Sequence, residues 1–510
     1  MMRFRYCLID EWPPLVWLAC CRQDDRTVTV LHGPRVEVQE HWFCEGIWDG
    51  DFGDGKLDRT DLVFGSGGCI RDSQVTFVSS GATVDRLQSL ERGDQVWVSN
   101  SLVCLLAVTE IPLDPTYPGY PEFFGSIVSG LVQYQRHLEA ARGTIQLTYF
   151  HNLAWDGFTL HEVEKPTPPR DFGSFERYRS FLDRALGKIL ENAADPARRF
   201  PYGLLGTLSS GYDSSTVTAL AREHGLREVI SFSEARGGAA DDGARIAEIL
   251  GVDLTLIPRH SWRQSRLAEI PFLAADAKGE DVYFTGAESL LHGRVLLTGF
   301  HGDKMWGKQV PCLDSYIVRA DQSGLSLTEY RLWAGFIHFP VPFMGVREIR
   351  KVNEISHAPE MRSWDVPGDY SRPICRRIVE EAGVPRELFG VSKKAASVLL
   401  GTGDSRLSER GQSDYRDWLR LHSDALAARR RVPTHLSGDL LARMYAPYRT
   451  GMRVARKIAR SAPKSLRPRA AQLLSHLEGP EYRLNLFRYA YPWAVEQAKD
   501  RYRTLYVQQW

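Results

Sequence analysis

The sequence predicts an α/β protein with a β-rich amino-terminal domain, a doubly wound parallel sheet and a helical carboxyl-terminal part. Two observations support this prediction. Aromatic and β-branched runs separated by turn residues fill the first 160 positions, which is typical of strands. From residue 201 onward, short apolar runs alternate with helical patterns, which is typical of a parallel sheet covered by helices.

Length and composition narrow the class of protein. A chain of 510 residues is too long for one ordinary core, so we expect two or three domains. The net charge of +1 provides no basic surplus, and we expect no nucleic-acid partner. The first residues carry charges inside their apolar stretches, and no apolar run approaches the ~18 residues of a membrane span. We therefore expect a soluble, cytoplasmic protein.

The amino-terminal domain is predicted to span residues 1–160. Four segments have the strand pattern, namely 25–33, 73–81, 94–100 and 143–152. A helical insertion is expected near residues 125–141. The proline-rich residues 161–173 then predict a linker.

The second predicted domain spans residues 174–425, and a helical, basic extension follows at 426–510. Apolar residues at helical spacing over 174–194 predict a helix with Ser174 as its N-cap. Buried strands are expected at 202–208, 228–234, 252–258 and 294–300. Helices that end in glycine are expected at 214–225 and 242–251.

The first candidate site follows the strand-like run that ends at Leu208, where the sequence reads SSGYDSS. A tight turn between a strand and a helix exposes backbone N–H groups and the positive end of the helix dipole. Gly211 allows close approach of an anion, and the serines add hydroxyl donors. Asp213 would repel a phosphate, so its presence indicates a bridging cation. A serine-capped turn without a ligand is the alternative.

The second candidate site follows another expected strand, where residues 299–307 read GFHGDKMWG. Its glycines and Asp303 again suit an anion together with a metal. Ligands of such sheets bind beyond the carboxyl ends of the strands, so Asp213 and Asp303 are predicted to hold Mg²⁺ between them. Taken alone, this loop could also be a plain turn.

Together, the two loops resemble those of the asparagine synthetase superfamily of ATP pyrophosphatases. The first family motif, commonly SGGxDSS, has Ser210 in place of a glycine and matches at Ser209, Gly211, Asp213, Ser214 and Ser215. The second, commonly G-x-G-x-D-x-x-x-G, has His301 in place of its middle glycine and matches at Gly299, Asp303 and Gly307.

The resemblance implies an ATP-pyrophosphatase domain of the adenine nucleotide α-hydrolase-like fold, preceded by a domain like the Ntn amidotransferases. It implies that the first loop grips the phosphates of ATP, that Asp213 and Asp303 coordinate Mg²⁺, and that the strand at 228–234 contacts adenine. The ATP-binding residues implied in this way are Leu208, Ser209, Ser210, Gly211, Asp213, Ser214, Ser215, Ser231, Phe232, Gly299 and Phe300.

Residues 383–403 resemble the family stretch that brings a lysine into the active site. By that register Lys393 takes the catalytic position, and the sequence leaves open whether Lys394 does so instead. A cation there would stabilise charge that develops as a carboxylate attacks the α-phosphorus of ATP. A solvated lysine pair is the alternative.

The beginning of the chain departs from the glutamine-dependent members of the family. Those enzymes begin with Met-Cys, whereas Met2 stands here in place of the nucleophilic cysteine and Cys7 lies in a strand-like run. An amino-terminal nucleophile uses its own α-amine as base. We therefore expect a degenerate domain without glutaminase activity, similar to that of β-lactam synthetases and lasso-peptide cyclases.

Two further comparisons with these families concern the base. β-Lactam synthetases use a tyrosine and a glutamate; Phe300 takes the tyrosine position and Glu329 is the candidate glutamate, which disfavours a β-lactam product. His301 is similar to the histidine in the His-Gly-Gly-Asp loops of lasso cyclases, and we expect a base with a pKa near neutrality. A turn histidine without a catalytic role is the alternative.

These inferences predict an ATP-dependent, AMP-forming ligase that adenylates a carboxylate and joins it to an amine without using glutamine, in natural-product or glycan biosynthesis. ATP and Mg²⁺ are the expected cofactors, and a small molecule or peptide is the expected substrate. The predicted catalytic residues are Lys393, Asp213, Asp303, His301 and Glu329. The alternatives are a lasso-type macrolactam cyclase, a glutamine- or ammonia-dependent amidotransferase and a non-catalytic scaffold. The sequence leaves open whether the chain forms a homodimer.

One basic segment remains. Residues 443–469 carry nine Lys or Arg side chains and no Asp or Glu. Such a segment could contact anionic lipids. Because Pro447, Pro463 and Pro468 are expected to break a long amphipathic helix, a solvated basic surface is the favoured interpretation.

Overall fold

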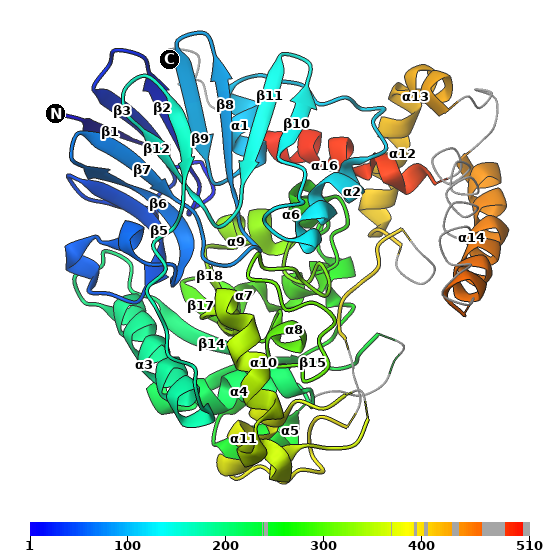
Figure 1. Cartoon of the computed structure of the whole chain (residues 1–510). Helices are drawn as coiled ribbons and strands as arrows, with labels where there is room; N and C mark the ends of the chain where they lie inside the picture. The colour runs from blue at the N-terminus through cyan, green and yellow to red at the C-terminus, as the bar shows by residue number, and fades with distance from the viewer. Residues whose placement is uncertain are drawn as a thin grey trace.

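A computed structural model describes residues 1–236, 238, 243–368, 370–391, 395–401, 406–430, 438–461 and 485–502. These residues form a mixed α/β protein with three β-sheets and a helical carboxyl-terminal part (Figure 1). At this level the predicted fold class is confirmed. No helix of the described ranges is both long and apolar enough to span a membrane.

The amino-terminal part contains two sheets. The first has the strand order β1-β3-β2-β9-β8-β11-β10 and the second the order β13-β12-β7-β6-β5-β4. The strands of the first are β1 (Arg3–Leu8), β2 (Trp17–Arg22), β3 (Thr27–His32), β8 (Leu87–Arg92), β9 (Gln95–Ser99), β10 (His137–Ala140) and β11 (Gly143–Thr148). Those of the second are β4 (Glu37–Val38), β5 (Trp42–Trp48), β6 (Val63–Arg71), β7 (Gln74–Val78), β12 (Asn152–Trp155) and β13 (Leu160–Val163).

The two sheets enclose a buried aromatic core. Trp17 of β2 lies with its ring centroid 5.1 Å from that of Phe43 and 6.1 Å from that of Phe77, both on the second sheet. Its indole N–H donates to the hydroxyl of Ser66 at 3.0 Å, so the one polar atom of the ring is satisfied. The alternating apolar residues of the strands therefore face each other across this layer.

All four strand segments predicted for this domain form strands, but the helical insertion near residues 125–141 is wrong. That stretch contains a short 3-10 helix (Ser126–Ser129) followed by β10. Leu138 is buried opposite Ile145 of β11, whereas its neighbours His137 and Glu139 are exposed. The period is therefore two and fits a strand. The predicted boundary at residue 160 also falls inside an element, since β13 continues to Val163.

The third sheet is parallel throughout, as predicted. Its strands are β14 (Gly203–Thr207), β15 (Glu228–Phe232), β16 (Asp253–Ile257), β17 (Arg294–Thr298) and β18 (Ile337–Pro340), in the order β16-β15-β14-β17-β18. The chain moves outward from β14 to β16 and returns on the other side of β14 at β17. The order of the strands thus reverses between β14 and β17. The sequence analysis did not find β18, because four residues that end at a proline are too few to show a period.

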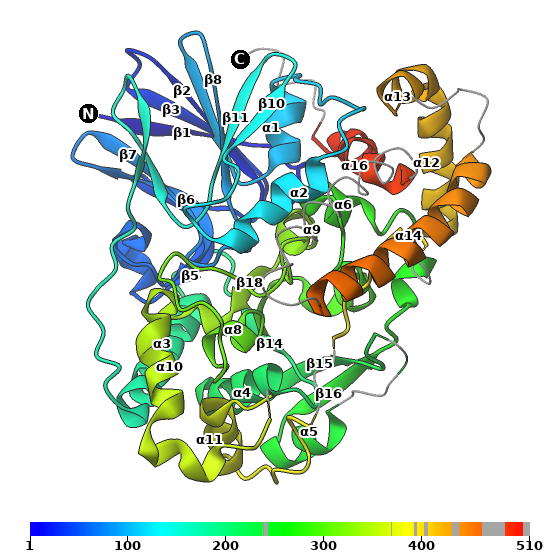
Figure 2. The same cartoon turned by 45° about the vertical axis from the view of Figure 1, so that its right-hand side comes forward.

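Helices cover this sheet on both sides. Figure 2 shows α4 (Tyr212–Ala221), α5 (Ala244–Leu250) and α11 (Pro373–Glu381) together on the side away from the amino-terminal sheets. The predicted helix at 174–194 is α3 (Phe175–Ala194), and its N-cap Ser174 accepts a hydrogen bond from the amide of Arg177, as expected. The remaining helices around the sheet are α6 (Ile270–Asp276), α7 (Glu288–Leu291), α8 (Gly302–Met305), α9 (Leu327–Ala334) and α10 (Ile349–His357).

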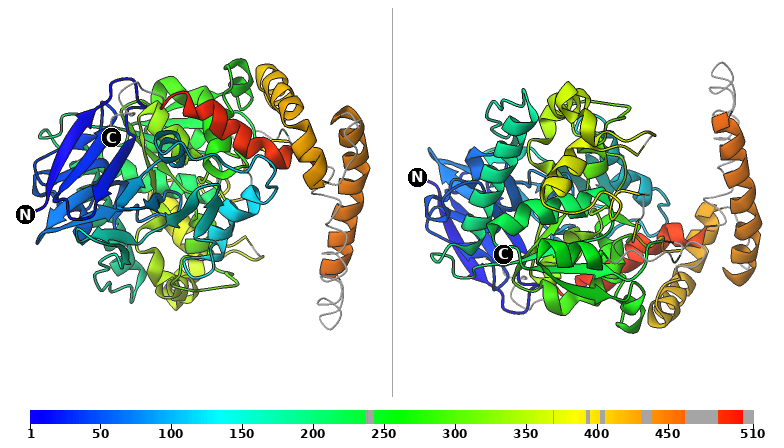
Figure 3. Two further views of the ribbon diagram at one scale, coloured as in Figure 1. Left: turned by 90° about the horizontal axis from the view of Figure 1, so that it is seen from above. Right: turned by 90° about the horizontal axis from the view of Figure 1, so that it is seen from below.

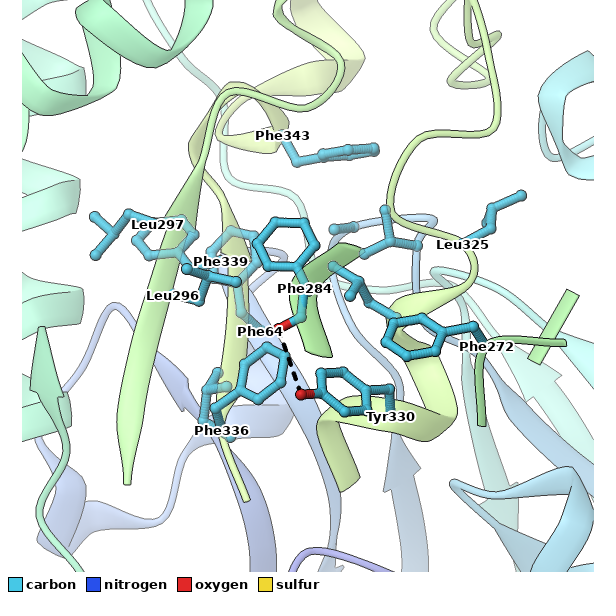
Figure 4. Close-up of a cluster of buried hydrophobic side chains, with 14 of the residues drawn as sticks. Phe64, Phe272, Phe284, Leu296, Leu297, Leu325, Tyr330, Phe336, Phe339 and Phe343 are labelled. Atoms are coloured by element: carbon cyan, nitrogen blue, oxygen red, sulfur yellow. Dashed lines mark hydrogen bonds between the residues drawn. The ribbon is translucent and has the colours of Figure 1, made fainter. Parts of the chain in front are cut away.

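A continuous contact joins the amino-terminal sheets to the parallel sheet. The rings of Phe64 on β6 and Phe339 on β18 lie 4.1 Å apart, within the apolar cluster of Figure 4. Beside it, the buried guanidinium of Arg331 on α9 donates to Glu45 of β5 at 2.6 Å and to Asp85 at 2.9 Å. Because these charges are buried and paired, they fix the position of α9 relative to the amino-terminal sheets.

The carboxyl-terminal residues divide into two groups. Helix α16 (Ala490–Lys499) packs on α6 and on α1 (Leu102–Val108), and Tyr491 and Trp493 are fully buried there. The other short helix of the amino-terminal part, α2 (Tyr120–Gly125), contacts α6. Helix α16 therefore belongs to the core of the protein.

The basic segment lies on a different element. Helices α12 (Glu409–Leu421) and α13 (Ser423–Arg430) lead toward α14 (Gly438–Ser461), which stands apart from the rest of the protein in Figure 3. Pro447 lies inside α14, so the expected break at this proline is wrong. Pro463 and Pro468 lie outside the described residues.

Candidate functional site

The two loops singled out in the sequence lie at neighbouring strand ends. β14 and β17 pair directly, with Leu205 opposite Leu296 and Gly206 opposite Leu297. Because the strands are parallel, the loops that begin at Leu208 and Gly299 leave the same edge of the sheet. This edge is where the strand order reverses, and ligands of open α/β sheets bind in the crevice at such a point.

Hydroxyl groups hold the first loop in its turn. The Ser214 hydroxyl accepts from the amide of Ser209 at 3.0 Å and shares a hydrogen bond with the Ser209 hydroxyl at 2.8 Å. The Ser209 hydroxyl also accepts from the amide of Gly211 at 3.1 Å. Helix α4 begins directly after Gly211, so its first amides and the loop face the same space.

Two of the predicted ATP-binding serines do not line the pocket at this edge. Ser215 is fully buried and donates to the carbonyl oxygens of Ser209 at 3.0 Å and Gly211 at 2.8 Å. Ser215 therefore stabilises the loop from its buried side. The carbonyl of Ser210 accepts from the amide of Gly390 at 2.9 Å, which ties the loop to the chain that precedes Lys393.

The second loop passes so close to the first that only glycine fits. A Cβ atom on Gly299 would lie 2.6 Å from the carbonyl carbon and from the Cβ of Asp213. One on Gly302 would lie 2.5 Å from the carboxylate oxygen of Asp213. Gly302, one position after the middle glycine of the family motif, thus serves the contact between the two loops, and Gly299 and Gly302 are needed for close approach rather than for a turn alone.

His301 does not have the properties predicted for it. Its φ of 75° is a left-handed conformation that side chains rarely adopt, at the position where the family motif has glycine. Its ring is buried and stacks on Phe343 with centroids 4.6 Å apart. Burial, with the nearby charge of Arg319, lowers the pKa of His301 to about 3 instead of near neutrality. A neutral, buried ring of this kind is a poor base at neutral pH.

The pocket is lined by most of the predicted residues. Nine of the eleven predicted ATP-binding residues line it, namely Leu208, Ser209, Gly211, Asp213, Ser214, Ser231, Phe232, Gly299 and Phe300. Asp303 and His301 line it as well. The rings of Phe232, Phe284 and Phe300 form one continuous wall, with centroids 5.2 Å and 6.5 Å apart.

Glu329 lies outside this pocket. Its carboxylate accepts hydrogen bonds from Ser101 at 2.8 Å, from the indole of Trp333 at 3.0 Å and from the hydroxyl of Tyr502. Burial raises its pKa, which these three donors partly offset. Glu329 therefore joins α9 to Ser101 of the amino-terminal part and to Tyr502, which follows α16, and it is not among the residues that line the pocket.

Lys393 and Lys394 lie outside the described residues. The residues that follow them, Ala395–Ser397, line the pocket. Arg259 donates to the carbonyl oxygens of Ala396 at 2.7 Å and Ser397 at 2.8 Å, which fixes this segment beside the end of β16.

Several lining residues were missed by the sequence analysis. They are Thr207, Tyr212, Ile230, Glu234, Asp281, Tyr283, Phe284, Asp321, Ser323, Tyr370 and Arg372. Most of them come from segments without a recognisable motif. Arg372 contacts the carboxylate of Asp213 directly. No local pattern in the sequence could have identified Arg372, because 159 positions separate it from Asp213.

The carboxylates of the pocket can be compared with the ligands that Mg²⁺ requires. In the described part of the chain, no group of three or more His, Cys, Asp or Glu side chains is arranged to hold an ion by itself. Mg²⁺ is usually bound by one or two carboxylates together with waters and substrate phosphates. Asp213 and Asp303, which both line the pocket, fit that ion only when a phosphate chain supplies further oxygens.

These features define a class, an α/β protein whose parallel sheet carries a polar pocket at its point of strand reversal. Comparison of the sequence with protein-family models and with curated proteins finds no match. The function is therefore inferred from the geometry of the pocket and from the resemblance of its two loops.

Proposed function

We propose that the protein is an ATP-dependent, AMP-forming ligase that adenylates a carboxylate and joins it to an amine. The observation that carries this proposal is the approach of the second loop to Asp213, with Asp303 on the same pocket. In this proposal the parallel sheet is an ATP-pyrophosphatase domain, and the amino-terminal sheets are a degenerate amidotransferase-like domain.

The pocket offers separate places for the parts of ATP. The loop from Leu208 to Ser214 presents amides and hydroxyl groups to the phosphates, and β15 brings Ser231 and Phe232 to the adenine. When bound, Mg²⁺ would neutralise the pyrophosphate leaving group through Asp213 and Asp303. With both substrates held at one sheet edge, attack of the amine on the acyl-adenylate becomes effectively intramolecular.

Cys7 supports chemistry without glutamine. It lies within β1 and pairs with Leu31 of β3 in a ladder that runs from Arg3 to Leu8. Exposing Cys7 as an amino-terminal nucleophile would require removal of most of that strand. We therefore propose that the amine comes from the substrate and not from hydrolysis of glutamine.

Binding of a non-hydrolysable ATP analogue tests the proposal without knowledge of the substrate. Isothermal titration calorimetry of the full chain with α,β-methylene-ATP is expected to show Mg²⁺-dependent binding. Asp213→Asn and Asp303→Asn are expected to weaken it at least tenfold, about 1.4 kcal/mol. Asp253→Asn is the matched control, because this exposed aspartate begins β16 at the opposite edge of the sheet. Wild type that binds no analogue at any Mg²⁺ concentration would refute the proposal.

A non-catalytic scaffold is the second candidate. The contact of Arg372 with Asp213 favours it, because the guanidinium occupies an oxygen that Mg²⁺ would need. Pyrophosphate exchange into ATP, measured with pools of amino acids and peptides as carboxylates, separates the two. A ligase exchanges label and loses that activity in Asp303→Asn, whereas a scaffold binds the analogue and exchanges none.

A further inference from the structure

Asp281 is a buried carboxylate that lines the pocket beyond the two loops. One of its oxygens accepts from the hydroxyl of Ser326 at 2.7 Å and from the amide of Gly324 at 3.0 Å. The other, Oδ1, is buried and has no hydrogen-bond partner among the described residues. A buried carboxylate oxygen without a donor is costly, so it indicates a ligand that supplies one.

A second acid lies close to Asp281, because the two carboxylates accept from the adjacent amides of Ser323 and Gly324. Asp321 is exposed and also lines the pocket, and its Oδ1 accepts from the amide of Ser323 at 3.0 Å. Phe284 and Phe300, the latter from the second loop, line the same pocket with ring centroids 6.5 Å apart. The pocket thus combines two acids with aromatic faces, a combination that suits an organic cation.

Burial lowers the pKa of the nearby Arg319, and the charges of Asp321 and Asp281 partly offset this, but in the part of the chain that the structure describes Arg319 makes no hydrogen bond to Asp281. Arg319 is buried and donates instead to the carbonyl oxygens of Thr83 at 3.1 Å and of Ser323. Within the described residues, no ion pair joins Asp281 or Asp321 to Lys, Arg or His. The other titratable groups that act on Asp281 are Asp276, Glu280 and Tyr283, none of which is cationic.

We propose that this acidic end, Asp281 with Asp321, binds the ammonium group of the amine substrate. The proposal rests on the ligase function above and adds the chemical class of the nucleophile, a primary amine attached to an apolar or aromatic group.

The charge state of Asp281 is consistent with such a role. Burial raises its pKa to about 7, and the neighbouring acids Asp276 and Glu280 add to the shift. Protonation of Asp281 would compete with a bound cation, so the affinity for an ammonium ion is expected to rise between about pH 6 and about pH 8. The same rise is expected to be much smaller in Asp281→Asn.

Three probes of one shape and different charge test the proposal on the full chain. Saturation-transfer NMR titrations would compare benzylammonium, benzyl alcohol and benzoate, each with and without Mg²⁺ and α,β-methylene-ATP. Benzylammonium is expected to bind at least tenfold tighter than the other two. Equal binding of the three probes, or no binding of benzylammonium at 20 mM, would overturn the proposal.

Single variants locate the binding. Asp281→Asn and Asp321→Asn are each expected to weaken benzylammonium at least fivefold and to change benzyl alcohol less than twofold. Asp314→Asn is the control, because its carboxylate caps the amide of Tyr316 as Asp321 caps that of Ser323, yet it does not line the pocket. Unchanged benzylammonium affinity in both pocket variants would refute the assignment.

Nucleotide binding keeps this test separate from that of the ligase. Each variant is expected to bind α,β-methylene-ATP within twofold of wild type, which shows that the pocket is folded. If wild type binds benzylammonium selectively but binds no nucleotide, the proposed ligase function is contradicted. The proposal that the acidic end binds an ammonium group still stands in that case. Wild type that binds nucleotide but not benzylammonium would contradict only the acidic end.

Discussion

Arg372, the residue directly ahead of α11, contacts the carboxylate of Asp213 on α4. The arginine side chain is 6% exposed and the aspartate side chain 26%. Burial alone would lower the pKa of Arg372, but the charge and hydrogen bond of Asp213, together with Cys375 and Tyr370, outweigh burial and raise it. The guanidinium is therefore charged, and one of the two proposed Mg²⁺ ligands is held in an ion pair.

Removal of this arginine is expected to ease metal binding. In Arg372→Gln, Mg²⁺ no longer competes with a guanidinium for Asp213, so the Mg²⁺ concentration for half-maximal binding of α,β-methylene-ATP is expected to fall at least threefold. Calorimetric titrations at fixed analogue measure it. Arg377→Gln is the control, since Arg377 pairs with Glu381 outside the pocket. A higher Mg²⁺ requirement would show instead that Arg372 itself contacts the phosphates.

Two adjacent serines are expected to behave differently. Ser214→Ala and Ser215→Ala each remove hydrogen bonds within the first loop, and each is expected to lower the free energy of unfolding by about 1 kcal/mol. Because only Ser214 of the two lines the pocket, Ser214→Ala is expected to weaken binding of the ATP analogue more than Ser215→Ala does. Urea denaturation and calorimetry compare the two. A greater loss of affinity in Ser215→Ala would contradict the described orientation of the loop.

Gly299 is expected to tolerate no side chain. In Gly299→Ala the new Cβ would lie 2.6 Å from Asp213, so the loops must separate. Overpacking of this kind lowers the free energy of unfolding by about 1–3 kcal/mol, and analogue binding is expected to weaken with it. Gly53→Ala is the control, because nothing lies within 4 Å of a Cβ there. If Gly299→Ala binds the analogue as wild type does, the close approach is not required for the site.

His338 on β18 is expected to make the protein sensitive to acid. Burial lowers its pKa to about 3, whereas its ordinary value is 6.5. Between these values the unfolded chain binds a proton that the folded protein does not, so stability falls as pH decreases. Relative to His338→Gln, wild type is expected to lose about 2 kcal/mol between about pH 6.5 and pH 5.

Urea denaturation of both proteins at the two pH values measures this loss. The exposed His137 in β10 is the control, and His137→Gln is expected to follow wild type at both values. A constant difference between wild type and His338→Gln would contradict the prediction, because it would show that the ring binds protons equally in the folded and unfolded states.

Much of the fold could be predicted because its signals are local. The strands of the parallel sheet are apolar runs bounded by turn residues, and Ser174 caps α3 where the sequence places it. Errors arose where local signals were weak or were overridden. Residues 137–140 gain strand pairing only from β11, and Pro447 remains inside α14.

Both strand-end loops could be predicted from the sequence because each is a short, contiguous motif, one around Asp213 and the other around Asp303. The residues that surround these loops could not be predicted, because distant segments bring them together. Three residues of the pocket come from separate segments, namely Arg372, Asp281 and Asp321. Glu329 lies outside the pocket, where it accepts a hydrogen bond from Ser101. Such contacts depend on the packing of elements that are distant in the sequence. Periodicity and spacing along the chain carry no information about which distant side chains contact each other.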